Sequence, residues 1–261
     1  MILRVFQRIG AAVISYFREI GILAILLYRI IASTGYVFRR PRLLLDQMIR
    51  IGVNSLPLIS VVSIFTGAVT AWQAAYQFQI VIAGALSLDF LGAASSAAIL
   101  IELSPVLAGI VVAGRVGASI AAELGTMKVT EQIDALESLA IDPVQYLAAP
   151  RFTAGYIMLP VLVIYSYLIA HFGAYVVASI MLGISTNTFF GSVQRYFLVY
   201  NVYSGMLKAL VFGGGTALIG CSIGFQASGG AEGVGRATIR AFVFSSAFIL
   251  IADYVLAVIL F

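Results

Sequence analysis

Two stretches of this chain, 51–88 and 152–194, contain no Asp, Glu, Lys or Arg. Each is longer than the roughly 20 apolar residues that a helix needs to cross a bilayer. Of all 261 residues, 62% are hydrophobic and 10% are charged, whereas a soluble domain usually has about 25% charged residues. We therefore expect an all-α, polytopic membrane protein in which no soluble domain of useful size remains.

The apolar segments predict five transmembrane helices, and the basic residues predict their orientation. The spans are expected at 52–82, 92–121, 152–182, 203–226 and 241–260. Eight of the fifteen Lys and Arg residues lie within the first fifty positions, and basic residues close to span ends stay on the cytoplasmic side. We therefore expect a cytoplasmic N-terminus, an outer C-terminus and a Gly-rich cytoplasmic loop at 227–240. The basic charge then lies at the membrane surface, and nucleic acid is not implied.

The first 45 residues are expected to form a region of their own before a transmembrane domain at 46–261. At 2–32 the charged residues fall on one side of a helix, and the uncharged run 20–28 is too short to span a bilayer. This pattern predicts an amphipathic helix in the membrane interface, followed by a basic turn. The alternative is a true first span whose Arg29 extends to the interface.

Small residues recur every fourth position in two of the predicted spans. The second span carries Gly109, Ala113, Gly117 and Ala121, and the fourth carries Thr216, Gly220 and Gly224. This spacing places small residues on one helix face, where two backbones can approach closely. The pattern predicts helix packing within one subunit, and a seam between two subunits is the alternative.

Three charged residues, Glu102, Lys208 and Asp253, fall inside predicted spans. The predicted topology places all three in the outer half of the bilayer, where an unpaired charge is costly. Because their depths are similar, we expect a Glu102–Lys208–Asp253 cluster. Such a cluster either lines a polar, outward-facing cavity or locks helices together. Pro105 lacks an amide hydrogen and is expected to bend the helix just after Glu102.

The segment 126–142 is predicted to be a short amphipathic helix on the cytoplasmic side. Thr126 or Thr130 can cap its start, and Asp142-Pro143 is expected to stop it. Its apolar residues share one side of the helix, and its acidic residues lie on another side: Glu131, Asp134 and Glu137. Acidic side chains are poorly suited to the anionic cytoplasmic leaflet. They therefore favour a protein partner with basic residues, and a plain interfacial helix is the alternative.

Motifs for chemistry within the chain are absent. The sequence has no Gly-x-x-x-x-Gly-Lys-Ser/Thr run, so it carries no phosphate-binding loop of its own. The one histidine, His171, lies in an apolar run without a second histidine to share a metal, and we expect it to be a core residue. We predict no catalytic residue, no metal and no cofactor in this chain, and an intramembrane enzyme is a weak alternative.

The segment 102–143 contains Glu102-Leu-x-Pro105, Ala113-Gly-Arg-x-Gly-Ala118, Ala122-Glu-Leu-Gly125, and the run from Met127 through Thr130-Glu-Gln132 to Ala140-Ile-Asp-Pro143. In these residues the chain resembles the MlaE family of permeases, the membrane subunits of ABC transporters that work with MCE proteins. A second patch is Gly233-Val-Gly-Arg-Ala-Thr238. The resemblance covers roughly 45–260.

The resemblance implies a homodimeric permease of an inner membrane, with an MCE protein on the outer side and phospholipid as substrate. It implies that two ATPase subunits, which hold ATP and Mg, dock on the 126–142 coupling helix. The residues expected to take part in that coupling are Glu123, Lys128, Glu131, Asp134 and Glu137. An outward-facing pocket between the two subunits is implied for the lipid, and its expected lining is Trp72, Gln73, Tyr76 and Glu102.

The sequence therefore predicts an ATP-driven phospholipid permease. The alternative is an ion- or proton-coupled secondary transporter that uses Glu102 and Asp253 as carriers. The two differ in a simple way, because a secondary transporter works without an ATPase and depends on the proton gradient.

Overall fold

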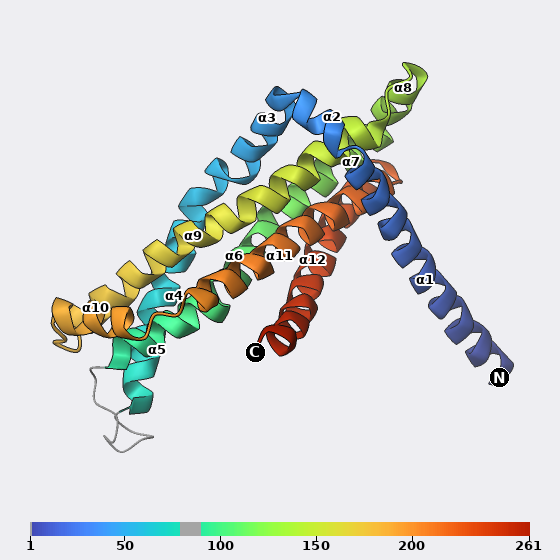
Figure 1. Ribbon diagram of the computed structural model, residues 1–261. Helices are drawn as coiled ribbons and strands as arrows, with labels where there is room; N and C mark the ends of the chain where they lie inside the picture. The colour runs from blue at the N-terminus through green and yellow to red at the C-terminus, as the bar shows by residue number, and fades with distance from the viewer. Residues whose placement is uncertain (1, 79–89) are drawn as a thin grey trace.

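The computed structural model describes residues 2–78 and 90–261, with side chains from Phe17 onward. Every element of this described part is helical (Figure 1), which confirms the all-α prediction. The elements are α1 (Ile2–Ala32), α2 (Thr34–Arg39), α3 (Pro41–Ile51), η1 (Val53–Ser55), α4 (Leu56–Tyr76), α5 (Leu91–Ala98), η4 (Ile99–Leu103), α6 (Ser104–Val112), η5 (Ala113–Gly117), α7 (Ala118–Val129), α8 (Gln132–Ser138), η6 (Val144–Ala148), α9 (Ala149–Ile180), α10 (Thr186–Arg195), α11 (Val199–Phe225) and α12 (Gly230–Leu260).

Five helical stretches of the described chain are long and apolar enough to cross a membrane, as predicted. They are Pro41–Tyr76, Leu91–Val129, Val144–Ile180, Val199–Phe225 and Gly230–Leu260. Most begin or end several residues beyond the predicted limits, because polar residues at the membrane boundary continue the helices. The end of the first predicted span and most of the loop predicted to follow it fall at 79–89, outside the described residues.

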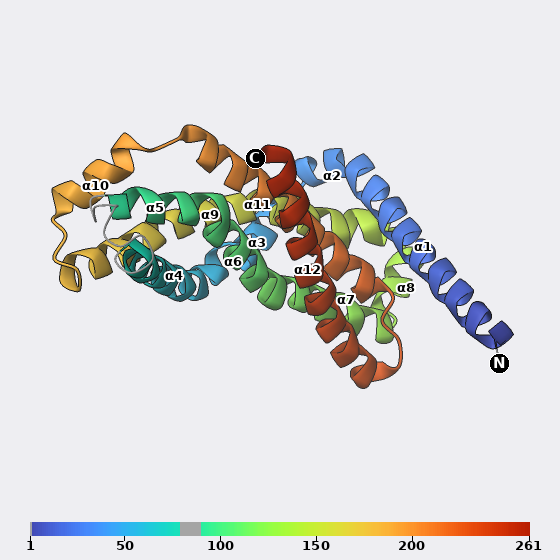
Figure 2. The same cartoon turned by 90° about the horizontal axis from the view of Figure 1, so that it is seen from below.

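The long helix α9 lies at the centre of the bundle and packs against α4 and α11, while α7 packs along α11 and α12 (Figures 1 and 2). Glycine makes the closest crossing possible. A Cβ on Gly67 would overlap the Ala170 carbonyl, and a Cβ on Gly173 would overlap the Ile64 carbonyl. The backbones of α4 and α9 therefore meet directly, as small residues allow in membrane helices.

The four-residue spacing of small residues serves packing within one subunit. A Cβ on Gly220 would lie 2.8 Å from the Gly117 carbonyl oxygen, and one on Gly117 would lie 2.9 Å from Thr216. These contacts join η5 to α11, so the favoured interpretation of the pattern is confirmed.

The prediction of a loop at 227–240 is wrong. Only a short connection follows α11, and α12 begins at Gly230. Gly229 has a φ of 90°, a conformation that glycine adopts without steric cost, so the chain turns sharply there. The Glu232–Arg236 ion pair, one helical turn apart, then supports the first turns of α12. Glycines alone did not prevent helix formation.

Helix α1 is continuous and leaves the bundle, so that its N-terminal end lies away from the other helices in both views (Figures 1 and 2). It is not among the five helices of membrane-spanning character. Two ion pairs attach its later part to the bundle: Arg29–Asp142 at 3.0 Å and Glu19–Arg240 at 3.6 Å. Its location in the membrane interface stays a prediction.

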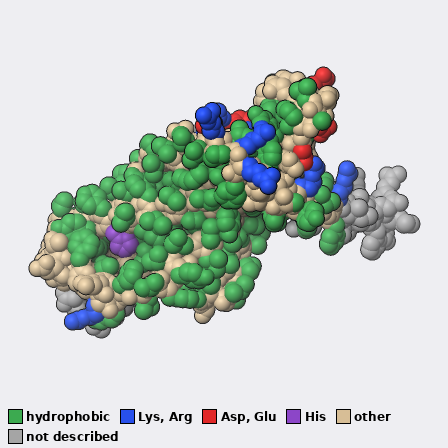
Figure 3. All heavy atoms as spheres, turned by 45° about the horizontal axis from the view of Figure 1, so that its top comes forward, with side chains coloured by type: hydrophobic (Ala, Val, Ile, Leu, Met, Phe, Trp, Pro, Cys, Tyr) green, Lys and Arg blue, Asp and Glu red, His purple; other side chains and the backbone are tan. Residues whose placement is uncertain are grey.

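Charge is concentrated at one end of the molecule. Figure 3 shows an apolar surface over most of the visible face, with most of the visible basic and acidic side chains gathered near α2, α7 and α8. Such a surface suits a protein whose apolar middle lies in hydrocarbon and whose charged end lies in water.

Candidate functional site

Lys208 in α11 joins two carboxylates from different helices. Its Nζ lies 2.6 Å from Glu102 Oε2 and 2.8 Å from Asp253 Oδ1. The predicted Glu102–Lys208–Asp253 cluster is therefore confirmed as a contact. The Lys208 side chain is fully buried, that of Asp253 is 12% exposed and that of Glu102 is 43% exposed. Glu102 is thus the member of this Lys208 cluster that is accessible from outside the bundle.

Glu102 lies in a π-helical turn, η4, directly before Pro105. Because Pro105 has no amide hydrogen, the regular hydrogen-bond ladder is interrupted at this point. The Tyr167 hydroxyl of α9 donates to the Leu100 carbonyl at 2.9 Å, which satisfies one acceptor within the turn. Single π turns often occur at functional positions. The sequence predicted a bend here from Pro105, although it did not predict the tyrosine.

Trp72, Gln73 and Tyr76 are exposed side chains at the end of α4. Within the described residues no hydrogen bond or ion pair joins them to Glu102 or binds the Gln73 amide. An amide that faces hydrocarbon without a partner is costly. This face of α4 is therefore suited to a polar or hydrated surrounding, and its role in binding stays a prediction.

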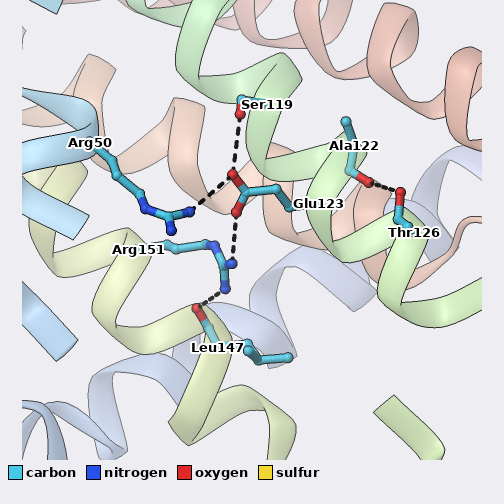
Figure 4. A network of polar contacts seen from close by, with 7 residues as sticks. All are labelled: Arg50, Ser119, Ala122, Glu123, Thr126, Leu147 and Arg151. Carbon is cyan, nitrogen blue, oxygen red and sulfur yellow. Dashed lines mark hydrogen bonds and ion pairs between the residues drawn. The ribbon is translucent and has the colours of Figure 1, made fainter. Parts of the chain in front are cut away.

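Glu123 lies inside a polar network at the opposite end of the same long helix (Figure 4). One carboxylate oxygen accepts from Arg151 of α9 at 3.0 Å, and the other lies 3.4 Å from both Arg50 of α3 and Ser119. Arg151 also donates to the Leu147 carbonyl at 2.9 Å. Glu123 was predicted to contact an ATPase, but its carboxylate is engaged within the chain.

The predicted single helix at 126–142 is wrong, because the chain breaks at Thr130 and Glu131. Helix α7 ends at Val129, Glu131 has a φ of 61°, and the separate helix α8 covers only Gln132–Ser138. The Thr126 and Thr130 hydroxyls donate to carbonyls one turn earlier instead of capping a start. A left-handed residue is uncommon outside glycine, and the sequence has no glycine here to signal the break.

The Asp142-Pro143 pair starts the next helix and does not stop the preceding one. Helix α8 ends at Ser138, and Ala140 has a φ of 58°. The Asp142 carboxylate accepts from the Val144 amide at 2.9 Å. An aspartate at this position followed by proline is the usual way to begin a helix.

The coupling segment, residues 128–139, projects from the charged end of the bundle (Figure 1). Ile133 is buried against the bundle, whereas Glu131 and Glu137 are exposed. Lys128 pairs with Asp134 at 2.7 Å and joins α7 to α8. Sequence reasoning missed Leu139, which is 71% exposed beside these acidic residues. In the sequence, the only indication of an exposed contact at Leu139 was an apolar side chain within a polar segment.

His171 is satisfied within the bundle, as predicted. Its ring nitrogens lie 2.7 Å from the Tyr167 carbonyl oxygen and 2.9 Å from Ser96 Oγ. No group of three His, Cys, Asp or Glu side chains that could hold a metal occurs among the described residues.

Five long apolar helices hold a charged cluster, and a polar segment projects from one end, an arrangement suited to a membrane transport subunit. The model of the family "Permease MlaE" matches residues 44–259. The chain belongs to the MlaE permease family. It is therefore the permease subunit of a transporter and a multi-pass inner membrane protein.

Two of the relatives match the whole chain, and a third matches most of it. A probable ABC transporter permease of Rickettsia typhi is 39% identical over 100% of this chain and 99% of its own length. The intermembrane phospholipid transport system permease protein MlaE of Haemophilus influenzae is 33% identical over 100% and 99%. The chloroplastic protein TRIGALACTOSYLDIACYLGLYCEROL 1 of Arabidopsis thaliana is 38% identical over 82% of this chain and 60% of its own length.

Proposed function

We propose that this permease moves phospholipid between the inner membrane and an MCE protein on the outer side. A separate ATPase, which binds ATP and Mg, supplies the energy. The name of the Haemophilus relative, a phospholipid transport permease, supports the phospholipid substrate, and the name of the Rickettsia relative, an ABC transporter permease, supports the ATPase partner. The observation that carries the proposal is the Lys208 cluster, whose Glu102 carboxylate is open while its lysine is fully buried.

The lipid site is proposed at the face formed by Trp72, Gln73, Tyr76 and Glu102. Aromatic side chains combine an apolar ring with a polar edge, so they can meet acyl chains and a head group. Glu102 provides a charge that its buried lysine partner stabilises. We further propose that two copies of the chain form a homodimer and cover the exposed face of α4, which encloses the site between them.

The ATPase is proposed to dock on the coupling segment from the cytoplasm, where the N-terminus also lies. Glu131 and Glu137 are its exposed, unpaired carboxylates within the described chain, and Leu139 adds an apolar contact beside them. Apolar anchors within a charged rim are typical of protein interfaces. Asp134 and Lys128 act by holding the segment's shape, because they pair with each other.

The deciding experiment is co-purification of the ATPase with permease variants. Glu131→Lys combined with Glu137→Lys is expected to abolish association while the permease stays folded, because neither carboxylate is paired within the described chain. Full-affinity binding by this variant would show that docking occurs elsewhere. Lipid transport by the purified complex should stop without ATP and continue when the proton gradient is collapsed. The opposite dependence would favour the proton-coupled transporter that uses Glu102 and Asp253.

The variant Glu102→Ala distinguishes the function of the outer end of the molecule from that of its cytoplasmic end. Lipid transfer should fall because the variant removes the open carboxylate, whereas ATPase binding should be unchanged because the coupling segment lies at the far end of the helix. Unchanged transfer would leave Glu102 with a purely structural role.

A further inference from the structure

Glu123 connects α7 to helices on the other side of the bundle. Helix α7 packs chiefly along α11 and α12. The Glu123 carboxylate reaches the other way, to Arg151 of α9 and Arg50 of α3 (Figure 4). One side chain thus joins α7 to α3 and α9, two helices that α7 otherwise contacts little. This Glu123 latch (Arg50, Glu123 and Arg151) is distinct from the Lys208 cluster.

The two charged clusters lie at opposite ends of one helical rod. Leu91–Val129 forms a single membrane-spanning stretch, and Glu102 and Glu123 lie about 30 Å apart along it at 1.5 Å per residue. The Lys208 cluster fixes the rod to α11 and α12 at one end. The Glu123 latch fixes it to α9 and α3 at the other. Movement of the end of α7 relative to α3 and α9 therefore strains the Glu123 ion pairs.

The interface beside the latch is loosely packed. A cavity of about 90 Å³ lies between α3 and α7, and its lining includes Gln47, Arg50, Ser119 and Glu123. Arg50 and Glu123 are 61% and 39% exposed, so their attraction is screened and can break at low cost. Arg151 is buried at 7% exposure and holds its place through Leu147. Within the latch, the Arg151–Glu123 ion pair is therefore fixed, whereas the Arg50–Glu123 ion pair can open.

The coupling segment is attached directly to this rod. The Lys128–Asp134 ion pair closes the turn between α7 and α8 at 2.7 Å, and Ile133 is buried against the bundle. A displacement of α8 is thus passed to the end of α7, where Glu123 lies about one and a half turns before the helix ends.

We propose that Glu123 is a positioning residue for transport, and that its latch transmits movement of the coupling segment to α3 and α9. This inference rests on the proposed ATP-driven function. In the wild-type cycle the Arg50–Glu123 contact opens and closes as the end of α7 moves away from α3 and returns. Glu123 touches neither lipid nor ATPase in this account.

The test measures lipid transferred per ATP hydrolysed by the purified complex in proteoliposomes of phosphatidylethanolamine and phosphatidylglycerol. Glu123→Ala should lower this ratio by about fivefold, the scale on which a partly exposed ion pair shifts an equilibrium. The ATPase rate and the melting temperature should change much less. Glu123→Gln keeps the side-chain shape but removes the charge, so it should also lower the ratio. This second variant keeps the test valid if the alanine variant folds poorly. Glu232→Ala removes an ion pair within α12 alone and should leave the ratio unchanged.

A second measurement follows the latch itself. Gln47→Cys and Ser119→Cys both line the cavity, and Cys221 is buried, so a bifunctional thiol reagent reports on this interface. Cross-linking should differ between the nucleotide-free and ATP-bound complexes. Equal cross-linking in both states, or a wild-type ratio for folded Glu123→Ala and Glu123→Gln complexes, overturns the latch. If the wild-type permease binds no ATPase, the proposed function itself fails.

Discussion

Removal of the buried lysine should damage the protein far more than removal of its exposed partner. Lys208→Met leaves Asp253, which is 12% exposed, without its counter-charge, and breaking a buried pair in this way costs about 3–5 kcal/mol. Glu102→Gln leaves the Lys208–Asp253 pair intact. Because the Glu102 carboxylate is 43% exposed and opens toward the proposed hydrated lipid site, we expect its contribution to be about 1 kcal/mol or less.

The difference is measurable as thermal stability in detergent at a fixed scan rate. At about 2–4 °C per kcal/mol for a chain of this size, Lys208→Met should lower the Tm by about 6–20 °C. Glu102→Gln should lower it by no more than about 4 °C. Adding Asp253→Asn to Lys208→Met should restore part of the loss, because the uncompensated charge is gone. Equal losses for the two single variants, or no recovery in the double variant, would refute the reasoning from burial.

Three further outcomes are expected. Gly67→Ala should lower the Tm by several degrees, because the added Cβ meets the Ala170 backbone. Gly191→Ala should leave the Tm unchanged, because nothing lies within 4 Å of its Cβ position. Similar Tm values for the two variants would contradict the direct backbone crossing of α4 and α9. Leu139→Ser should weaken ATPase binding by about tenfold without lowering the Tm, as loss of a buried apolar anchor costs about 1–3 kcal/mol; unchanged affinity in a titration would remove Leu139 from the interface. Arg29→Ala should change the Tm by less than about 2 °C, since its pair with Asp142 is exposed, and a larger loss would show that α1 is held chiefly through this pair.

The sequence predicted the parts of the fold that hydrophobicity decides. Apolar segments identified five spans, because long apolar helices are stable when buried in hydrocarbon. It also predicted the Lys208 cluster, since charges at similar depth inside a bilayer must find each other. The four-residue spacing of Gly117 and its neighbours predicted close packing for a comparable geometric reason.

The failures lie where backbone conformation is decided by tertiary contacts. The left-handed Glu131 and Ala140 residues have no local signal, because the Lys128–Asp134 pair and the buried Ile133 hold the turn in place. Glu123 was predicted to be a surface contact, because the sequence does not show that Arg50 and Arg151 converge on it from 73 and 28 residues away. Leu139 was overlooked because an apolar residue on a helix is usually buried.

The most direct test of the account is the side of the membrane on which the coupling segment lies. Cys221 is buried, so a Ser138→Cys variant carries one reactive thiol for a membrane-impermeant maleimide. The account predicts no labelling in intact spheroplasts, labelling in inverted membrane vesicles and protection there when the ATPase is bound. Labelling of intact spheroplasts would place this segment outside and contradict the proposal that an ATPase drives the permease through it.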